Sequence, residues 1–267
     1  MIKEDLIQQI KTKKSYLCVG LDSDITKIPT HLLQEKNPIL SFNKALIDAT
    51  KDFCVSYKIN TAFYEAQGVQ GWQTMEETLA YIPSEIFTIA DAKRGDIGNT
   101  SAQYAKAFFE TIPFDAITVA PYMGKDSLQP FLDYKNKWTI VLGLTSNEGA
   151  NDFEILETEK GKLYEEVIRK ISTWGTNENT MFVVGATQNL QIETIRKIIP
   201  NHFLLIPGVG AQGGNLQETS QVAMNNEVGI LVNSSRQIIY ASNEKDFAEK
   251  ARNEAQKMQL EMKDLMK

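Results

Sequence analysis

Short runs of apolar and β-branched residues recur along the chain, and each is followed by a stretch with helical spacing. The runs are continuous rather than alternating, which is typical of strands buried on both faces of a parallel sheet. The stretches between them, such as residues 38–52 and 192–199, carry apolar residues three or four positions apart, as amphipathic helices do. We predict eight strands, in runs that begin at Tyr16, Cys54, Ile86, Asp115, Thr139, Met181, Phe203 and Val228.

Eight strand–helix units in 267 residues predict an α/β fold of the closed (β/α)8 type, a TIM barrel. The alternative is a doubly wound open sheet, which usually has a Gly-rich turn after its first strand. Here the first strand runs into "VGLDSD" instead. No linker, repeat or shift in composition divides the sequence, so we expect one domain over residues 1–267. Its tail, from about residue 241, should form a last barrel helix with an apolar face made of Phe247, Ala251, Ala255, Met258 and Met262.

Composition and charge mainly exclude functions. A net charge of −6 argues against non-specific binding to nucleic acid. No apolar run reaches the length of a membrane-spanning helix, and the charged first fourteen residues lack the apolar block of a signal peptide. Cys18 and Cys54 lie in apolar runs, which favours buried, reduced thiols over a disulfide framework. We therefore expect a cytoplasmic protein that binds neither nucleic acid nor membrane.

Polar side chains gather at the predicted carboxyl ends of the strands, where TIM barrels hold their active sites. The later strands end in "APYMG", "TSNEG", "PGVGAQGG" and "NSSRQ". The opposite rim shows nothing comparable, and we expect His31 and His202 to be surface or structural residues. The charged and amide residues at the first three strand ends are Asp22, Lys58, Asn60, Asp91, Lys93 and, just beyond, Asp96.

The segment "ADAKRGDIGNTS" concentrates charge at the end of the third strand. Asp91 and Lys93 are two residues apart, so in an extended strand they face the same way and can point into the barrel mouth. Lys58 can reach the same place, and alternating charges would keep Lys93 protonated despite burial. An ion-pair lattice that merely joins the second and third strands is the alternative. Because Lys93 competes for the carboxylates of Asp91 and Asp96, and no His or Cys cluster exists, we expect no metal site.

A second charged site is predicted after the seventh and eighth strands. The Gly-rich segment "PGVGAQGG", residues 207–214, can offer backbone amides to an anion, and TIM barrels often hold phosphate in these two loops. Arg236 follows the eighth strand and supplies a guanidinium fork for phosphate oxygens. The two features together predict a phosphate site.

These motifs, taken in order, resemble those of the orotidine 5′-phosphate decarboxylase family. "DAKRGDIGNT" resembles its Asp-x-Lys-x-x-Asp signature, and "VGLD", "YKIN", "TVAPYMG", "LTSN", "PGVGAQGG" and "NSSR" resemble its other strand-end motifs, from about Val19 to Arg236. The stretches "APYMGKDSLQPF" and "GLTSNEGANDF" are similar to the larger bacterial-type subgroup. Gly98 stands where many members of the smaller subgroup have Pro, which bears on subgroup rather than on activity.

The resemblance implies cofactor-free decarboxylation of orotidine 5′-phosphate to uridine 5′-phosphate, the last step of UMP biosynthesis. It implies that Lys93 is the proton donor, that Asp91 lies near the substrate carboxylate, and that Lys58 pairs with Asp91 and touches the ribose. Asp96 and Thr100 would reach the partner's ribose across a homodimer interface. The implied substrate-binding residues are Asp22 at a ribose hydroxyl, Asn60, Ser146 at the pyrimidine amide edge, Pro207, and Gln212 with Arg236 at the phosphate.

This chemistry explains the dense charge. Loss of carbon dioxide from orotate leaves a carbanion on a vinyl ring carbon with no conjugated electron sink, and the sequence has no thiamine or pyridoxal motif. A fixed ammonium can stabilise that carbanion and then protonate it. Phosphate binding far from the reacting carbon can order the site, and residues 145–161 are long enough to form a lid.

Two other functions stay open at this point. One is a magnesium-dependent sugar-phosphate decarboxylase or aldolase of the same larger group, although Lys58 stands where that branch has an acidic metal ligand. The other is a non-catalytic sensor of nucleotide phosphates, against which the complete charged motif counts.

Overall fold

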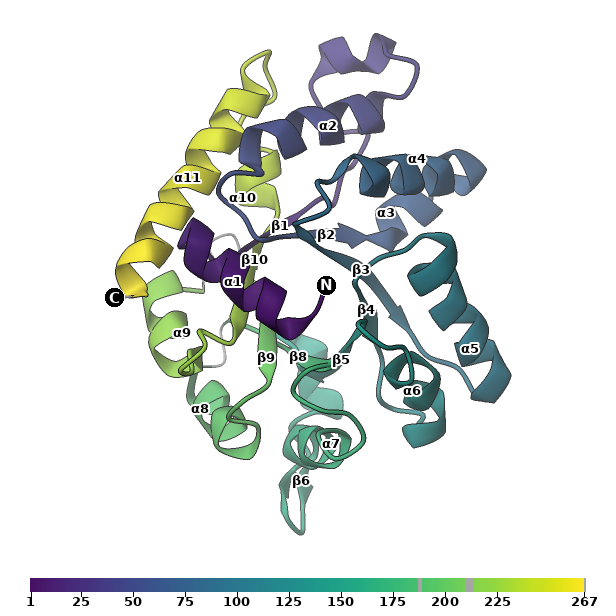
Figure 1. The fold of residues 1–267 in the computed structure, drawn as a ribbon, viewed down its shortest axis with the longest axis vertical. Helices are drawn as coiled ribbons and strands as arrows, with labels where there is room; N and C mark the ends of the chain where they lie inside the picture. Colours follow the sequence, from purple (N-terminus) through teal and green to yellow (C-terminus); the bar gives the residue numbers. More distant parts are fainter. Residues whose placement is uncertain (187–188, 210–213, 267) are drawn as a thin grey trace.

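The computed structural model of this protein describes residues 1–186, 189–209 and 214–266. Its eight predicted strands are all present and close into a parallel barrel in the order β1-β10-β9-β8-β5-β4-β3-β2. Figure 1 looks along this barrel, with helices around its outside. The barrel prediction is therefore confirmed, and the open sheet is excluded. The barrel strands are β1 (Leu17–Gly20), β2 (Ser56–Asn60), β3 (Phe87–Arg94), β4 (Ala116–Val119), β5 (Trp138–Leu144), β8 (Thr180–Val184), β9 (Phe203–Pro207) and β10 (Ile230–Ser234).

Helices lie between successive strands on the outside of the barrel, and α1 (Lys3–Lys13) precedes the first strand. The outer helices are α2 (Pro38–Thr50), α3 (Thr61–Glu65), α4 (Gly68–Tyr81), α5 (Gly98–Lys106), α6 (Lys125–Leu132), α7 (Leu163–Ile171), α8 (Asn189–Ile198), α9 (Leu216–Ala223), α10 (Arg236–Ile239) and α11 (Phe247–Leu265). Short helical segments occur at η1 (Thr30–Gln34), η2 (Ala107–Thr111) and η3 (Glu148–Asp152). A small hairpin of β6 (Glu157–Thr158) and β7 (Gly161–Lys162), which the sequence did not predict, lies between β5 and α7.

The barrel interior is packed, and its amino-terminal end is filled by aromatic rings. Phe87, Trp138 and Phe203 come from β3, β5 and β9, which are alternate strands around the barrel. The Trp138 ring meets each phenyl ring edge-on, with centroids 6.1 Å apart in both pairs. Side chains from alternate strands form such layers in TIM barrels, and edge-to-face contacts stabilise them further. The interior of the barrel is therefore closed at this end, and a cavity within it can open only toward the other end.

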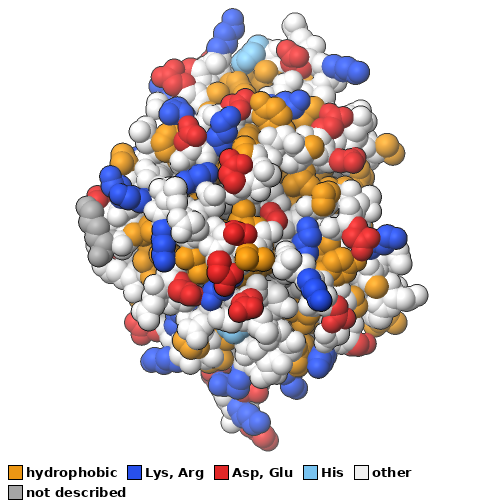
Figure 2. All heavy atoms as spheres, in the orientation of Figure 1, with side chains coloured by type: hydrophobic (Ala, Val, Ile, Leu, Met, Phe, Trp, Pro, Cys, Tyr) orange, Lys and Arg blue, Asp and Glu red, His pale blue; other side chains and the backbone are white. Residues whose placement is uncertain are grey.

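Helix α1 lies across the amino-terminal end of the barrel, in front of the strands in Figure 1. The indole Nε1–H of Trp138 donates to the backbone carbonyl of Met1 (3.0 Å), which ties the start of the chain to this end. Acidic and basic side chains are interspersed over the face shown in Figure 2. Among the described helices, none combines the length and apolar character needed to cross a membrane.

The predicted last helix is α11, and it packs beside α2 (Figure 1). Its buried residues are the five that the spacing predicted, Phe247, Ala251, Ala255, Met258 and Met262. Phe247 stacks on Phe42 of α2 with ring centroids 5.3 Å apart. The helix therefore closes the ring around the barrel through an apolar seam.

Candidate active site

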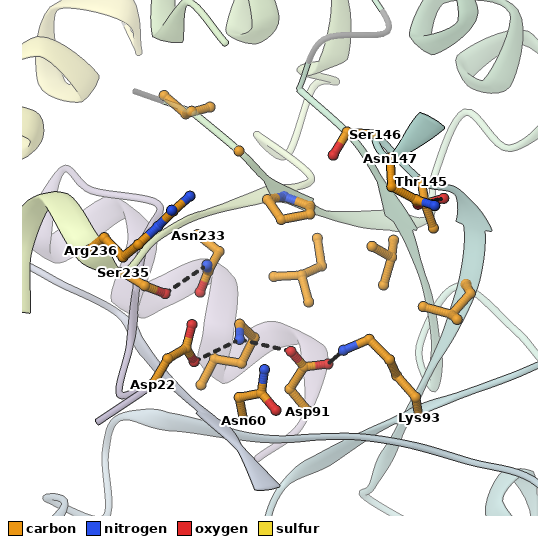
Figure 3. A pocket seen from close by; sticks show the side chains of 17 residues that line it. Asp22, Asn60, Asp91, Lys93, Thr145, Ser146, Asn147, Asn233, Ser235 and Arg236 are labelled. Atoms are coloured by element: carbon orange, nitrogen blue, oxygen red, sulfur yellow. Dashed lines mark hydrogen bonds and ion pairs between the residues drawn. The ribbon is translucent and has the colours of Figure 1, made fainter. Parts of the chain in front are cut away.

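A pocket of about 310 Å³ opens at the carboxyl ends of the barrel strands. This volume lies at the small end of the range of ligand pockets, roughly 300–1,000 Å³. Figure 3 shows its three polar sides: Asp22, Asn60, Asp91 and Lys93 on one, Ser235 and Arg236 on another, and residues 145–147 on the third. The structure thus brings together eight of the predicted site residues: Asp22, Lys58, Asn60, Asp91, Lys93, Ser146, Pro207 and Arg236.

Four charged groups of alternating sign form a row along the first side. The Lys58 Nζ lies 2.9 Å from Asp91 Oδ2 and 3.5 Å from Asp22 Oδ1, and the Lys93 Nζ lies 2.7 Å from Asp91 Oδ1. Their order follows from the strands, because β1, β2 and β3 are neighbours in the barrel. Lys58 lies in the middle of β2, Asp91 and Lys93 lie in the second half of β3, and Asp22 lies two residues beyond β1. We define Asp22, Lys58, Asp91 and Lys93 as the charged row.

Burial and opposite charge act against each other inside the charged row. Burial alone would lower the pKa of Lys58, but the negative charges of Asp91 and Asp22 outweigh it and raise that pKa above its usual value. Burial alone would raise the pKa of Asp91, but the ammonium groups of Lys58 and Lys93 hold it well below its usual range. Both residues are therefore ionised at neutral pH.

The two lysines of the charged row differ in exposure, and here one expectation from the sequence is wrong. The Lys58 side chain is only 6% exposed, whereas the Lys93 side chain is 48% exposed. Lys93 is thus not the buried lysine. Lys58 is locked between two carboxylates, and Lys93 stands at the open end of the row, where a ligand can reach it.

The expected geometry of β3 is also wrong at its end. Lys93 has a φ of 48°, in the left-handed region that residues with a side chain rarely adopt. The pairing of β3 with β4 shifts between Ala90 and Arg94, so the strand is bulged rather than extended there. The ammonium still meets Asp91, but it does so because the bulge redirects the side chain.

The second side of the pocket carries the predicted anion-binding groups. Arg236, the first residue of α10, and Ser235 line it together with Gly208 and Val209 of the Gly-rich segment. Ser235 Oγ accepts a hydrogen bond from Asn233 Nδ2 (3.3 Å), and Asn233 also faces the pocket. The sequence analysis missed Ser235 and Asn233 as pocket residues, although "NSSR" contains both. Gln212 lies outside the described residues.

The third side is formed by residues 145–147 after β5, including the predicted Ser146. Glu154, ten residues after the strand, accepts the backbone N–H of Thr145 (2.7 Å) on Oε2 and its hydroxyl (2.9 Å) on Oε1. Gly185, after β8, leaves room for this turn, because a Cβ there would lie 2.8 Å from the Ser146 Cβ. Glu154 was not predicted, because its contacts with Thr145 depend on how the connection after β5 folds back on itself.

Asp96 and Thr100 do not line the pocket. Thr100 is exposed on α5, and Asp96 Oδ1 accepts the backbone N–H of Ile97 (2.7 Å) just before that helix. Both lie beyond Lys93 on the connection that leaves the barrel mouth. Their predicted role concerns a partner's site and is taken up below.

The acidic groups do not form a metal cluster in the part of the chain that the structure describes. No three His, Cys, Asp or Glu side chains there could hold one ion together. The carboxylates of Asp22 and Asp91 both contact Lys58 instead.

Comparison with known proteins agrees with this geometry. A family model described as "Orotidine 5'-phosphate decarboxylase / HUMPS family" matches residues 15–251. The chain belongs to this family. The resemblance inferred from the motifs is therefore confirmed. The orotidine 5′-phosphate decarboxylase of Phocaeicola vulgatus is 56% identical over 270 residues, which cover 100% of this chain and 99% of that protein.

Solved structures of the family share the fold. A UMP synthase of Leishmania donovani superposes with a TM-score of 0.84 at 36% identity; the match covers 97% of this chain but only 57% of that longer one. An orotidine 5′-phosphate decarboxylase of the same organism gives a TM-score of 0.82 at 34% identity and covers 97% of this chain and 99% of that one. The barrel and its connections therefore correspond over nearly the whole chain.

Proposed function

We propose that this protein decarboxylates orotidine 5′-phosphate to uridine 5′-phosphate without a cofactor, as the last step of UMP biosynthesis, and that Lys93 donates the proton. The observation that carries the proposal is the charged row at the mouth of a pocket that also holds Arg236. The names of the similar proteins support it, since relatives that match the full length are orotidine 5′-phosphate decarboxylases.

The charged row assigns different tasks to its two lysines. Lys58 is fixed by two carboxylates, and its raised pKa makes it a poor acid. Lys93 contacts the row only through Asp91 among the described residues, and its half-exposed side chain can approach a ring carbon above the pocket. A preorganised ammonium stabilises the carbanion as it forms and then transfers a proton to it. The products are carbon dioxide and a C–H bond at the former carboxyl position.

Asp91 holds the proton donor in place and stays ionised itself. In this proposal it also lies near the substrate carboxylate, so that two negative charges approach each other until carbon dioxide leaves. Such ground-state repulsion is a contested contribution, and the placement of Lys93 does not depend on it.

The other two sides of the pocket suit the two ends of a nucleotide. Arg236 offers a fork of N–H donors to the phosphate, and Ser146 offers a hydroxyl to the amide edge of the pyrimidine. Asp22 and Asn60, between them, suit the ribose hydroxyls. Gln212 remains a predicted phosphate ligand on sequence grounds.

A homodimer is part of the proposal. Asp96 and Thr100 lie outside the pocket of their own chain, which fits a role in a neighbouring one. Ile97 and Met123 are 59% and 47% exposed, and Tyr122 is 92% exposed, on the two connections that follow β3 and β4. A second copy of the chain would cover these apolar side chains, and Asp96 of the first chain would then lie at the barrel mouth of the second.

A cytoplasmic location is also proposed; the two buried free thiols, Cys18 and Cys54, fit it.

Ultraviolet absorbance of orotidine 5′-phosphate, incubated with the purified protein, tests the activity. We expect absorbance to change for the wild type and no turnover for Lys93→Ala, with binding of uridine 5′-phosphate retained. Lys27→Ala is the matched control, because Lys27 is a half-exposed lysine in a looser ion pair (3.7 Å) away from the pocket. Normal turnover by Lys93→Ala would exclude the proton-donor role.

The same assay distinguishes the proposed decarboxylase from a magnesium-dependent enzyme of the same larger group. The two carboxylates that line the pocket in the described part of the chain, Asp22 and Asp91, are both paired with Lys58, so a divalent ion bound there would have to displace an ammonium. We expect excess EDTA to leave the rate unchanged.

A further inference from the structure

The conformation of Lys93 depends on a local irregularity in the barrel wall. In a regular parallel ladder, residues advance in step; here β3 advances four residues from Ala90 to Arg94 while β4 advances two, from Ile117 to Val119. The two extra residues of β3 lie in the stretch that contains Lys93. Its positive φ costs free energy, because the side chain is crowded by the backbone in this conformation. Surrounding contacts must therefore hold it.

Thr118 of β4 supplies the first of these contacts. It is fully buried, and its Oγ1 lies 2.9 Å from the backbone nitrogen of Lys93 and 3.0 Å from Asp91 Oδ1. A backbone N–H can only donate, and an ionised carboxylate can only accept. The hydroxyl therefore accepts from Lys93 and donates to Asp91. One side chain thus ties the backbone of the lysine to the carboxylate that pairs with its ammonium.

Arg94 anchors the bulge from the other side. The register shift removes the carbonyl of Ala92 from the regular ladder, and the Nη1 of Arg94 donates to it (3.0 Å). The guanidinium is itself fixed by an ion pair with Glu65 and by the faces of Tyr104 and Phe108. Hydrogen bonds from Thr118 and Arg94 therefore hold the bulge on both sides. Of these two side chains, Thr118 is the one that also bonds Asp91 of the charged row.

We propose that Thr118 is a positioning residue for proton transfer. It does not line the pocket and touches no substrate; it fixes the bulge that aims Lys93 and orients the carboxylate that holds the ammonium. This inference rests on the proposed function, because it assigns Thr118 a role only through Lys93. Small displacements of a reacting group can cost about a hundredfold in rate.

Thr118→Val tests this, since it removes the hydroxyl and keeps the shape. We expect kcat to fall about 10- to 100-fold while KM stays within about threefold, because the phosphate and base sides are untouched. Thr118→Ser restores the hydroxyl and should recover kcat to within about threefold. Thr139→Val is the matched control: Thr139 lies fully buried on the adjacent strand β5, and its Oγ1 has no hydrogen-bond partner among the described residues.

Three results would overturn the inference. One is a Thr118→Val variant as active as Thr139→Val; another is a Thr118→Ser variant as slow as Thr118→Val. The third is a parallel loss of activity and folded protein, shown by circular dichroism, which would assign Thr118 to stability alone. Where Thr118→Val does not fold, that third result is judged on Thr118→Ala, which removes the same hydroxyl without an added methyl group. Turnover by Lys93→Ala would instead refute the proton-donor role on which this inference rests.

Discussion

At the scale of single residues, the site works through the different environments of chemically similar groups. Lys58 and Lys93 both contact Asp91, at 2.9 and 2.7 Å, yet one side chain is nearly buried and the other half-exposed. A buried ammonium between two carboxylates is costly to move, because the loss of either partner leaves an uncompensated charge. The exposed ammonium is free to approach a ligand. The ammonium of Lys58 is therefore enclosed within the charged row, whereas that of Lys93 stands exposed at its end.

Arg236 provides a prediction at this scale. Among the described residues, the other charged side chains that line the pocket belong to the charged row, so the Arg236 guanidinium is the one charged group on the second side. Arg236→Ala therefore removes the fork of N–H donors that we assign to the phosphate. We expect KM for orotidine 5′-phosphate to rise about 10- to 100-fold, which corresponds to the loss of one or two charge-assisted hydrogen bonds. Steady-state kinetics measures this.

Two comparisons control the Arg236 experiment. A nucleoside substrate without phosphate should be turned over equally by the wild type and Arg236→Ala, and an equal loss with both substrates would contradict the assignment. Arg252→Ala is the matched variant, because Arg252 is a half-exposed arginine of α11 that does not line the pocket.

At the scale of elements, several polar groups of the pocket lie on connections after the strands, and contacts within and between elements fix these connections. The turn after β5 presents Ser146, and Glu154 fixes that turn through two hydrogen bonds to Thr145. Gly185 after β8 leaves it space. The end of β3 is set in the same way by Thr118 of β4. The pocket residues Lys93 and Thr145 are thus each held by a residue that does not itself line the pocket.

Glu154→Gln tests this dependence in the third side of the pocket. The amide cannot accept both hydrogen bonds from Thr145 as the carboxylate does, because one of its two polar atoms is a donor. We expect the turn to loosen, KM to rise several-fold, roughly the value of one weakened hydrogen bond to a charged group, and kcat to change less. Steady-state kinetics with Glu148→Gln, an exposed glutamate of the same connection, as control measures this. If Glu154→Gln has the same KM and kcat as that control, the turn does not depend on the hydrogen bonds of Glu154.

At the scale of the whole molecule, the two ends of the barrel have separate tasks. The amino-terminal end is filled by Phe87, Trp138 and Phe203 and covered by α1, so it contributes stability. The carboxyl end stays open and polar. Asp96 does not line the pocket of its own chain. In our proposal, therefore, a complete active site needs two chains.

Mixing two inactive variants tests that unit. In a two-fold symmetric dimer of Lys93→Ala with Asp96→Ala, one site combines the intact Lys93 of one chain with the intact Asp96 of the other. We expect each variant alone to be inactive, and a re-equilibrated equal mixture to recover up to about a quarter of wild-type activity, since half of randomly paired dimers are mixed and have one intact site. Sedimentation analysis verifies the dimer. No recovery in a mixture that does form dimers would place Asp96 in its own chain's site or outside catalysis.

The amino-acid sequence determined the barrel and the chemistry of its rim. Eight buried runs, each followed by an amphipathic stretch, suffice to predict the strands, because burial on both faces imposes a local pattern that any reader of the chain can see. Since parallel strands end at the same edge, the identity of the charged row followed as well. These features depend on local composition and on one topological rule.

Only the tertiary structure decided how those groups are placed. The register of β3 against β4 shifts between Ala90 and Arg94, and Lys93, with its left-handed φ, lies within that bulge. The burial of Lys58 and the exposure of Lys93 are likewise properties of the folded barrel. The tertiary structure also decided the contacts of Thr118 and Glu154. Thr118 bonds a backbone N–H and a carboxylate of β3, and Glu154 bonds the backbone and hydroxyl of Thr145 within the folded connection after β5. Register is a contact between distant segments, so no window of sequence contains it. The chain specifies which charges meet at the barrel mouth, and the tertiary structure decides which of the two lysines is buried and which is exposed.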